Sequence, residues 1–128
     1  MKFSTKAEYG LKAMVNLAKI YPAQKSIKIL ADEESVSSKY LERIMGELRK
    51  NGLVRSEKGK SGGYSLSKSP QKIPVGEIVE ILDGPIAPMK CSGAICAKTC
   101  VSSSIWIEVE NQIKKTLYKT TLKKLISK

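Results

Sequence analysis

The stretch SSKYLERIMGELRKNGLVRS, residues 37–56, decides the fold of this chain. The serine pair at its start offers a helix cap, and the Asn51-Gly52 pair ends the helix. Between these signals the apolar residues recur at helical spacing: Leu41, Ile44, Met45 and Leu48. The pattern therefore predicts an amphipathic helix with one buried face and one polar face.

Working outward, two strand-like runs follow at residues 53–57 and 64–67. The segment between them, KGKSGG at 58–63, is basic and rich in glycine, which favours a β-hairpin. Two further helical runs precede the stretch, one between Ser4 and Pro22 and one after Ser26. Three helices with a tight turn before the last, followed at once by a hairpin, predict a winged helix-turn-helix.

The remaining third of the chain predicts a short helix at 74–82 and a long amphipathic helix after residue 102. The long helix carries an apolar stripe of four residues: Trp106, Val109, Ile113 and Leu117. A second copy of the chain is the expected cover for this stripe, and packing onto the parent domain is the alternative. Residues 122–126 are expected to fold back as a turn that extends the same seam.

The predicted fold class is therefore mainly α with a small β-hairpin. Residues 1–84 form a winged helix-turn-helix DNA-binding domain, 85–101 a cysteine loop for a cluster, and 102–128 a dimerisation helix with a C-terminal turn.

The charge is strongly positive, at +11 with an isoelectric point near 9.6. Such a balance points to a polyanion, either a nucleic acid or an acidic membrane surface, although a basic surface can also serve solubility alone. There is no apolar run of membrane-spanning length and no secretory signal pattern. We expect a cytoplasmic protein with no membrane partner.

Polar residues at the start of the helix that follows residue 37 are the ones that can reach base edges in a major groove. The arginine can donate to guanine and the glutamate can accept from cytosine. The alternative is a solvated face with intrahelical ion pairs, Lys39 with Glu42 and Arg43 with Glu47. The expected DNA-binding residues are Ser37, Ser38, Lys39, Glu42, Arg43 and Arg49 of the helix, and Arg55, Lys58, Gly59, Lys60 and Gly62 of the wing.

Cys91, Cys96 and Cys100 are the only cysteines, and the chain has no histidine. An odd, tight group cannot be a closed set of disulfides, whereas three thiolates on one loop can bind an iron-sulfur centre. A zinc site and a reactive thiol pair favoured by Lys90 and Lys98 remain open. An enzyme is not expected, because the chain lacks a nucleophile elbow, a phosphate loop and a paired acid and base.

Residues 40–56, followed by Gly59 and by residues 62–66, resemble the signature of the IscR/NsrR family of winged-helix regulators, often called the Rrf family. The resemblance covers nearly the whole chain. It implies a homodimeric bacterial transcription factor, most often a repressor, that binds a palindromic operator in double-stranded DNA. It also implies sensing of iron-sulfur, redox or nitric oxide status through three cysteines placed as these are.

The same resemblance implies a [2Fe-2S] or [4Fe-4S] cluster with a fourth ligand from elsewhere. Some members use a histidine where this chain has Ser103, and others use a carboxylate from the partner's first helix, which here is Glu8 of the partner subunit. Glu8 also fits a capping box that begins at Thr5. The alternative function is a family regulator without a cluster, controlled by thiol oxidation or by a protein partner.

Overall fold

A computed structural model of the chain describes residues 2–59, 62–87 and 101–127. The described part is mainly helical with one antiparallel pair of strands, which confirms the predicted fold class. None of its helices is long and apolar enough to span a bilayer. In chain order the elements are α1 (Thr5–Ile20), α2 (Ile27–Glu33), α3 (Ser38–Lys50), β1 (Val54–Glu57), β2 (Gly63–Leu66), η1 (Pro70–Lys72), α4 (Val75–Asp83), α6 (Ser103–Lys119) and α7 (Leu122–Ile126).

Serine side chains begin the first three helices. Ser4, Ser26 and Ser37 each accept a hydrogen bond from the backbone N–H three residues further on, at 3.0, 3.2 and 3.1 Å. A side chain in this position satisfies one of the N–H groups that a helix start leaves without a partner, and contributes about 0.5–2 kcal/mol. At the other end of α3, Gly52 takes a φ of +80°, which turns the chain sharply into β1.

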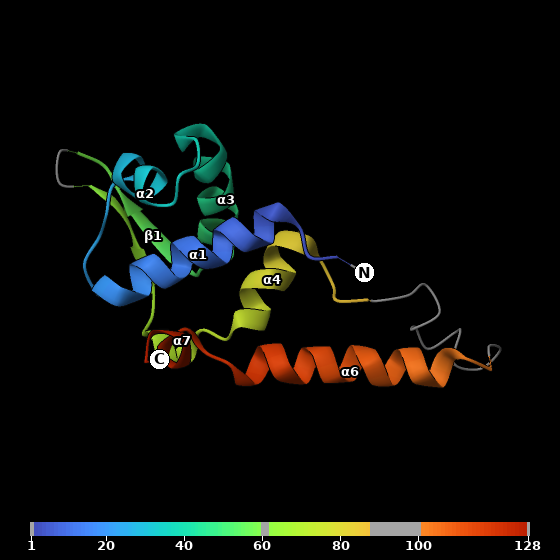
Figure 1. Ribbon diagram of the computed structural model, residues 1–128. Coiled ribbons are helices and arrows are strands. Elements are labelled where there is room, and N and C mark those ends of the chain that lie inside the picture. The colour runs from blue at the N-terminus through green and yellow to red at the C-terminus, as the bar shows by residue number, and fades with distance from the viewer. Residues whose placement is uncertain (1, 60–61, 88–100, 128) are drawn as a thin grey trace.

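The core lies where α1 crosses α3 and α4, as Figure 1 shows. The four apolar residues of the α3 stripe are fully buried in it: Leu41, Ile44, Met45 and Leu48. Burying a side chain of this size contributes roughly 1.5–3 kcal/mol, so this cluster dominates the stability of the fold. The largest fully buried side chains are Met14, Leu17, Leu30, Leu41, Ile44, Met45, Leu48, Leu53, Ile73, Ile78 and Leu122.

The wing is a two-stranded sheet with a third contact from the helical body. Val54 lies opposite Leu66, and both are buried against the core. On the outer edge of β2, Tyr64 exchanges two backbone hydrogen bonds with Lys25 of the α1–α2 connection, at 2.8 and 3.0 Å. This exchange fixes the wing to the helix-turn-helix.

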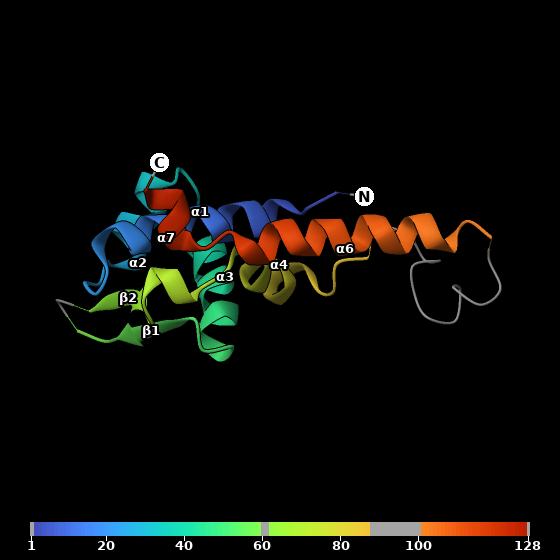
Figure 2. The ribbon, with the colours of Figure 1, turned by 90° about the horizontal axis from the view of Figure 1, so that it is seen from below.

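Helix α6 is joined to α4 near its C-terminal end. In Figures 1 and 2 it runs past α4 and away from the wing. At the junction, Val75 donates to the Thr120 carbonyl at 2.8 Å, and the Tyr118 hydroxyl donates to Glu80. The Tyr118 ring lies so close to Gly76 that a Cβ there would stand 2.9 Å from its Cγ. One end of α6 is therefore held firmly by α4.

Helix α7 corrects one expectation. Residues 122–126 do not extend the seam of the long helix, because α7 packs on α1 and η1. Leu122 is fully buried in the core of the winged helix, and its N–H donates to the Ile73 carbonyl at 3.0 Å. The last turn of the chain is thus a structural part of the winged helix.

Candidate nucleic-acid interface

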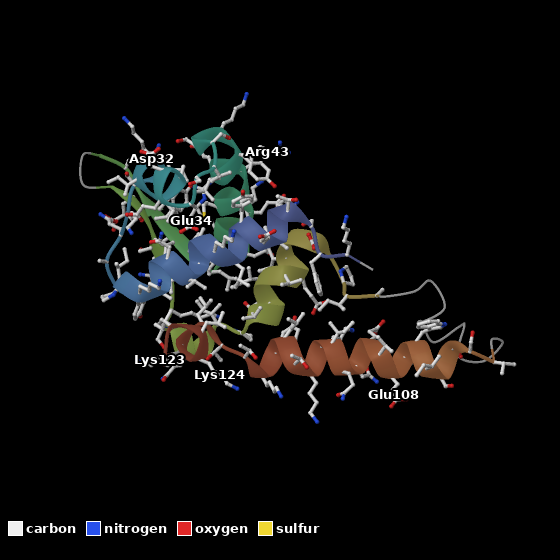
Figure 3. The ribbon with its side chains drawn as sticks, in the orientation of Figure 1. Asp32, Glu34, Arg43, Glu108, Lys123 and Lys124 are labelled. Carbon is white, nitrogen blue, oxygen red and sulfur yellow. The ribbon has the colours of Figure 1, made fainter. Side chains whose placement is uncertain are left out.

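The N-terminal half of α3 presents one exposed polar face. Ser38, Lys39, Glu42 and Arg43 are all exposed, on the side opposite the buried stripe, and Ser37 caps the helix beside them. Figure 3 places Arg43 on the outer side of α3, away from the core. The structure therefore brings together the five helix residues that sequence predicted for base contact.

The ion pairs of the alternative interpretation are absent from the described residues. Glu47 does not pair with Arg43. Its Oε2 lies 3.3 Å from Lys6 Nζ, and this ion pair ties α3 to α1. Within residues 2–59, 62–87 and 101–127, no ion pair involves Lys39, Glu42 or Arg43. Their charged groups are therefore not neutralised by one another and are available for a ligand.

The wing adds cations beside this helix. Arg55 and Lys58 are exposed on β1 and in the turn after it. Gly59 takes a φ of +107°, which an L side chain rarely adopts. A Cβ on Gly62 would stand 2.8 Å from the Lys58 carbonyl carbon, so the turn closes tightly only with glycine there. Lys60 lies outside the described residues.

The helix and the wing are joined by specific contacts. Arg49 Nη1 donates to Ser56 Oγ at 3.3 Å, which links the end of α3 to β1. Burial raises the pKa of Tyr64, Arg49 acts in the opposite direction and Glu42 adds to the rise, so these three groups lie within electrostatic reach of one another. The polar faces of α3 and the wing therefore form one surface.

A polar network behind the wing was not predicted from the sequence. It joins Asn16 of α1 to Lys25, and it includes both glutamates at the end of α2. These residues are far apart along the chain, and none belongs to a recognisable motif. Asn16 lies beside Lys12 and Lys19 on a polar edge of α1, where nothing in the sequence distinguishes it.

The apolar stripe of α6 is only partly covered in the single chain. Trp106, Val109, Ile113 and Leu117 are all half-buried, and Ile105 beside them is 48% exposed. A groove of about 340 Å³ runs along the stripe, bounded by Phe3 and by residues of α6. A second hollow of about 270 Å³ continues it between α1 and α4.

Of the predicted cluster ligands, Glu8 is the one that lies within the described residues. Cys91, Cys96 and Cys100 lie outside the described residues, and the described residues contain no group of three potential metal ligands. Glu8 is described, and its capping role is wrong, because Ser4 caps α1. The Glu8 side chain is 63% exposed, and its one ion pair within the part of the chain that the structure describes is with Lys12, at 3.3 Å. Such an exposed pair contributes little, so the carboxylate is free to bind another group.

Comparison with known proteins places the chain among bacterial regulators. Residues 3–128 match the Rrf2 family model, whose description is "Iron-dependent Transcriptional regulator". CymR of Bacillus subtilis (strain 168), a transcriptional regulator, is 38% identical over 99% of this chain and 91% of its own length. IscR of Pectobacterium carotovorum is 29% identical over 99% of this chain and 80% of its own length.

Solved structures agree with these matches. The structure of B. subtilis CymR, called the global cysteine regulator, superposes with a TM-score of 0.87 at 37% identity, covering 99% of this chain and 97% of that one. The oxidized form of Staphylococcus aureus CymR gives a TM-score of 0.80 at 36% identity, covering 98% and 95%. IscR of T. potens gives 0.80 at 34% identity, covering 99% and 87%.

The relatives are named as regulators of transcription and not as enzymes, and their winged-helix fold is the one described above. The chain belongs to the Rrf2 family of transcriptional regulators.

Proposed function

We propose that the chain acts as a homodimeric repressor that binds a palindromic operator in double-stranded DNA. The observation that carries this proposal is the single exposed surface formed by the start of α3 and the wing, on which Arg43, Arg55 and Lys58 are exposed. A helix of this kind reads base edges in the major groove, while the wing cations contact phosphates or the narrow minor groove.

The two parts of the surface have different roles in this proposal. Arg43 and Glu42 select bases, because an arginine pairs with guanine and a carboxylate is tolerated at DNA only where it accepts from a base. Arg55 and Lys58 supply affinity that does not depend on sequence.

Operator titrations at several salt concentrations test this division. Arg55→Ala should weaken binding to all duplexes. It should also reduce the salt slope, which is the slope of the logarithm of the binding constant against the logarithm of the salt concentration, by the equivalent of about one phosphate contact. Arg43→Ala should weaken operator binding more than random-duplex binding, by about 1–3 kcal/mol. Lys115→Ala, which removes an exposed cation from α6, is the matched control and should change neither value. Equal losses in all three variants would contradict the assigned surface.

The dimer follows from the half-covered stripe on α6. An amphipathic helix needs a cover for its apolar face, and a second α6 supplies the same chemistry. We expect sedimentation to show a dimer for the unaltered chain and a monomer for Ile113→Glu. Lys115→Glu, which introduces the same side chain on the exposed side of the same helix, should remain dimeric. A dimer that survives Ile113→Glu would place the interface elsewhere.

For the signal, we propose that Cys91, Cys96 and Cys100 hold an iron-sulfur cluster, with Glu8 of the partner subunit as the fourth ligand. The donor set suits this group, since thiolates bind such clusters and the exposed Glu8 carboxylate is free to join them. The similarity to IscR supports this choice. The bound cluster supplies a group that oxidants or small molecules alter, and a difference of about 1–3 kcal/mol in operator binding would give a roughly 5- to 150-fold response.

A second candidate is control by thiol oxidation without a cluster. It is favoured by the similarity to CymR, one of whose solved structures is an oxidized form. Anaerobic purification with iron and sulfide analysis separates the two. Iron and sulfide that disappear in the Cys91→Ser variant support the cluster. A metal-free protein whose operator affinity changes reversibly with peroxide and dithiothreitol supports the thiol.

A further inference from the structure

A pocket of about 630 Å³ lies between α1, α2 and α7. Its size falls within the roughly 300–1,000 Å³ that small-molecule sites occupy. It lies beside the α1–α2 connection and shares no lining residue with the groove along the α6 stripe. One wall is apolar and is formed by Leu11, Val15 and Leu125.

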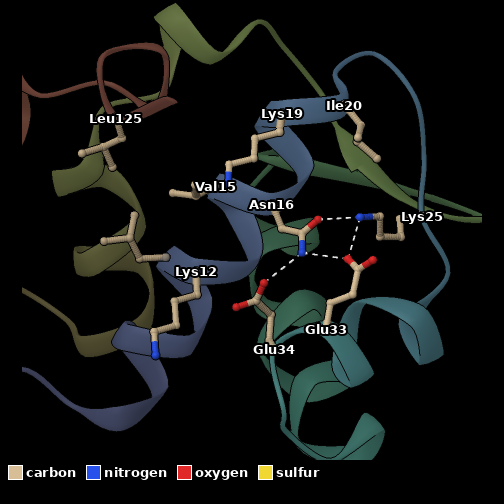
Figure 4. A pocket seen from close by; sticks show the side chains of 10 residues that line it. Lys12, Val15, Asn16, Lys19, Ile20, Lys25, Glu33, Glu34 and Leu125 are labelled. Atoms are coloured by element: carbon tan, nitrogen blue, oxygen red, sulfur yellow. Dashed lines mark hydrogen bonds and ion pairs between the residues drawn. The ribbon is translucent and has the colours of Figure 1, made fainter. Parts of the chain in front are cut away.

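The opposite wall is a network of charged and polar groups, drawn in Figure 4. Lys25 Nζ donates to Asn16 Oδ1 at 2.7 Å and to Glu33 Oε1 at 2.6 Å. Asn16 Nδ2 donates to Glu33 Oε1 at 3.0 Å and to Glu34 Oε2 at 2.8 Å. The Lys25 side chain is only 19% exposed, so its ion pair is partly shielded from water and is held in one geometry.

Two charges remain uncompensated at the pocket. Glu34 accepts a hydrogen bond from the neutral Asn16 amide, and among the described residues it faces no cation. Lys19 lines the pocket from α1 and takes part in no ion pair within the described ranges. Lys12, the remaining cation of the lining, pairs with Glu8 at 3.3 Å. Among the described residues, the pocket therefore offers one negative group and one positive group outside these ion pairs, together with an apolar wall.

We propose that this pocket binds a small zwitterion, namely a free α-amino acid with an apolar side chain. Its ammonium pairs with Glu34, its carboxylate pairs with Lys19, and its side chain packs on Leu11, Val15 and Leu125. A purely anionic ligand would be repelled by the glutamates, and a purely cationic one by Lys19. The combination of charges therefore selects the class.

Occupancy of the pocket acts on the wing through Lys25. The Lys25 backbone exchanges both hydrogen bonds with Tyr64 of β2, and its carbonyl lies directly against Gly63. A ligand ammonium bound at Glu34 competes with Lys25 Nζ for the adjacent Glu33 carboxylate, which Lys25 Nζ contacts at 2.6 Å. Release of this side chain loosens the backbone bridge between Lys25 and Tyr64 that holds the wing. The bound amino acid therefore lowers the affinity of the protein for DNA. This coupling rests on the DNA-binding function proposed above, whereas ligand binding itself does not.

Calorimetry with L-leucine and L-phenylalanine on the full-length dimer tests the site without DNA. We expect binding with a Kd of about 1 mM or below, corresponding to roughly 4 kcal/mol or more. N-acetyl-L-leucine and L-leucinamide each lack one of the two charges and should bind at least tenfold more weakly. Lys19→Met should lose binding to the same extent. Lys72→Met, which removes an exposed cation outside the pocket, should keep it. Absence of binding by both amino acids, or binding of either blocked analogue as tightly as L-leucine, overturns the site.

Operator titrations with and without saturating L-leucine test the coupling. We expect the ligand to weaken operator binding at least fivefold, and DNA to weaken L-leucine binding by the same factor, because linkage is reciprocal. In Lys19→Met the operator affinity should no longer respond to L-leucine. If L-leucine binds in the calorimeter but leaves the operator affinity unchanged, the coupling is overturned. If the ligand-free protein does not bind DNA at all, that result contradicts the proposed function and not the ligand site.

Discussion

Gly63→Ala is the sharpest test of how the wing is attached. Gly63 has a φ of +153° and lies against the α1–α2 connection, so that a Cβ there would meet the Lys25 carbonyl and stand 2.8 Å from Ser26 N. These atoms belong to backbone and cannot rotate away. The added methyl group must therefore push β2 off the helical body.

The cost follows from two terms. A side chain held at a positive φ costs about 1–3 kcal/mol. Separation also weakens the two backbone hydrogen bonds between Lys25 and Tyr64, at roughly 0.5–1.5 kcal/mol each. We expect the free energy of unfolding to fall by about 2–6 kcal/mol. The salt slope of DNA binding should fall as well, because the wing cations move away from the duplex.

Urea unfolding at one fixed protein concentration measures the loss. Gly46→Ala is the matched control, because a Cβ on Gly46 meets nothing within 4 Å and alanine favours the interior of α3. It should raise stability by roughly 0.5–1 kcal/mol. If Gly63→Ala unfolds at the same urea concentration as the unaltered chain, the attachment of the wing through Lys25 has been misjudged.

Three further predictions concern α1 and the base of α6. Ser4→Ala should lower the free energy of unfolding by about 0.5–2 kcal/mol through loss of the helix cap, and by more through loss of the hydrogen bond from the Ser4 hydroxyl to Asp83. The neighbouring control Thr5→Ala should lower it by less than about 0.5 kcal/mol. Thermal unfolding distinguishes the two variants. Gly76→Ala should overpack the Tyr118 ring and lower the free energy of unfolding by about 1–3 kcal/mol, as measured by urea unfolding. An unchanged urea midpoint would show that α6 shifts at this contact without cost. Burial, aided by the Glu80 carboxylate, raises the pKa of Tyr118 to about 12, so the unfolded chain ionises first. Stability is then complete below about pH 10 and falls as the pH rises toward about 12, and Tyr118→Phe should remove that part of the fall in unfolding experiments at alkaline pH.

Most of the helical framework was predictable because its signals are local. Ser4, Ser26 and Ser37 each cap a helix. The sequence pattern indicated a helix start near all three serines and a cap at the Ser37-Ser38 pair. The Asn51-Gly52 stop and the glycine-rich turn likewise depend on backbone geometry that neighbouring residues determine. Local chemistry of this kind can be read directly from residue order.

The errors concerned the last turn of the chain, the start of α1 and the network at Asn16. Residues 122–126 were expected to fold back and extend the seam of the long helix, yet the Leu122 N–H donates to the Ile73 carbonyl and its side chain is buried in the core. Glu8 was given a capping role that fits its spacing from Thr5, but Ser4 begins the helix one residue earlier. The Asn16 network has no periodicity at all, because it depends on three separate segments meeting behind the wing.

Because α6 is anchored at the close contact between Gly76 and Tyr118, a small tilt at that contact produces a large displacement of the other end of the helix. Its 17 residues span roughly 25 Å at about 1.5 Å per residue, and only the end at Tyr118 is anchored by α4. A tilt of about 10° at that fulcrum would carry the far end through roughly 4 Å, more than the rise of one base pair, about 3.4 Å. In the dimer proposed above, the tight contact at Gly76 therefore limits how far the two DNA-binding surfaces can shift relative to the spacing of the operator half-sites.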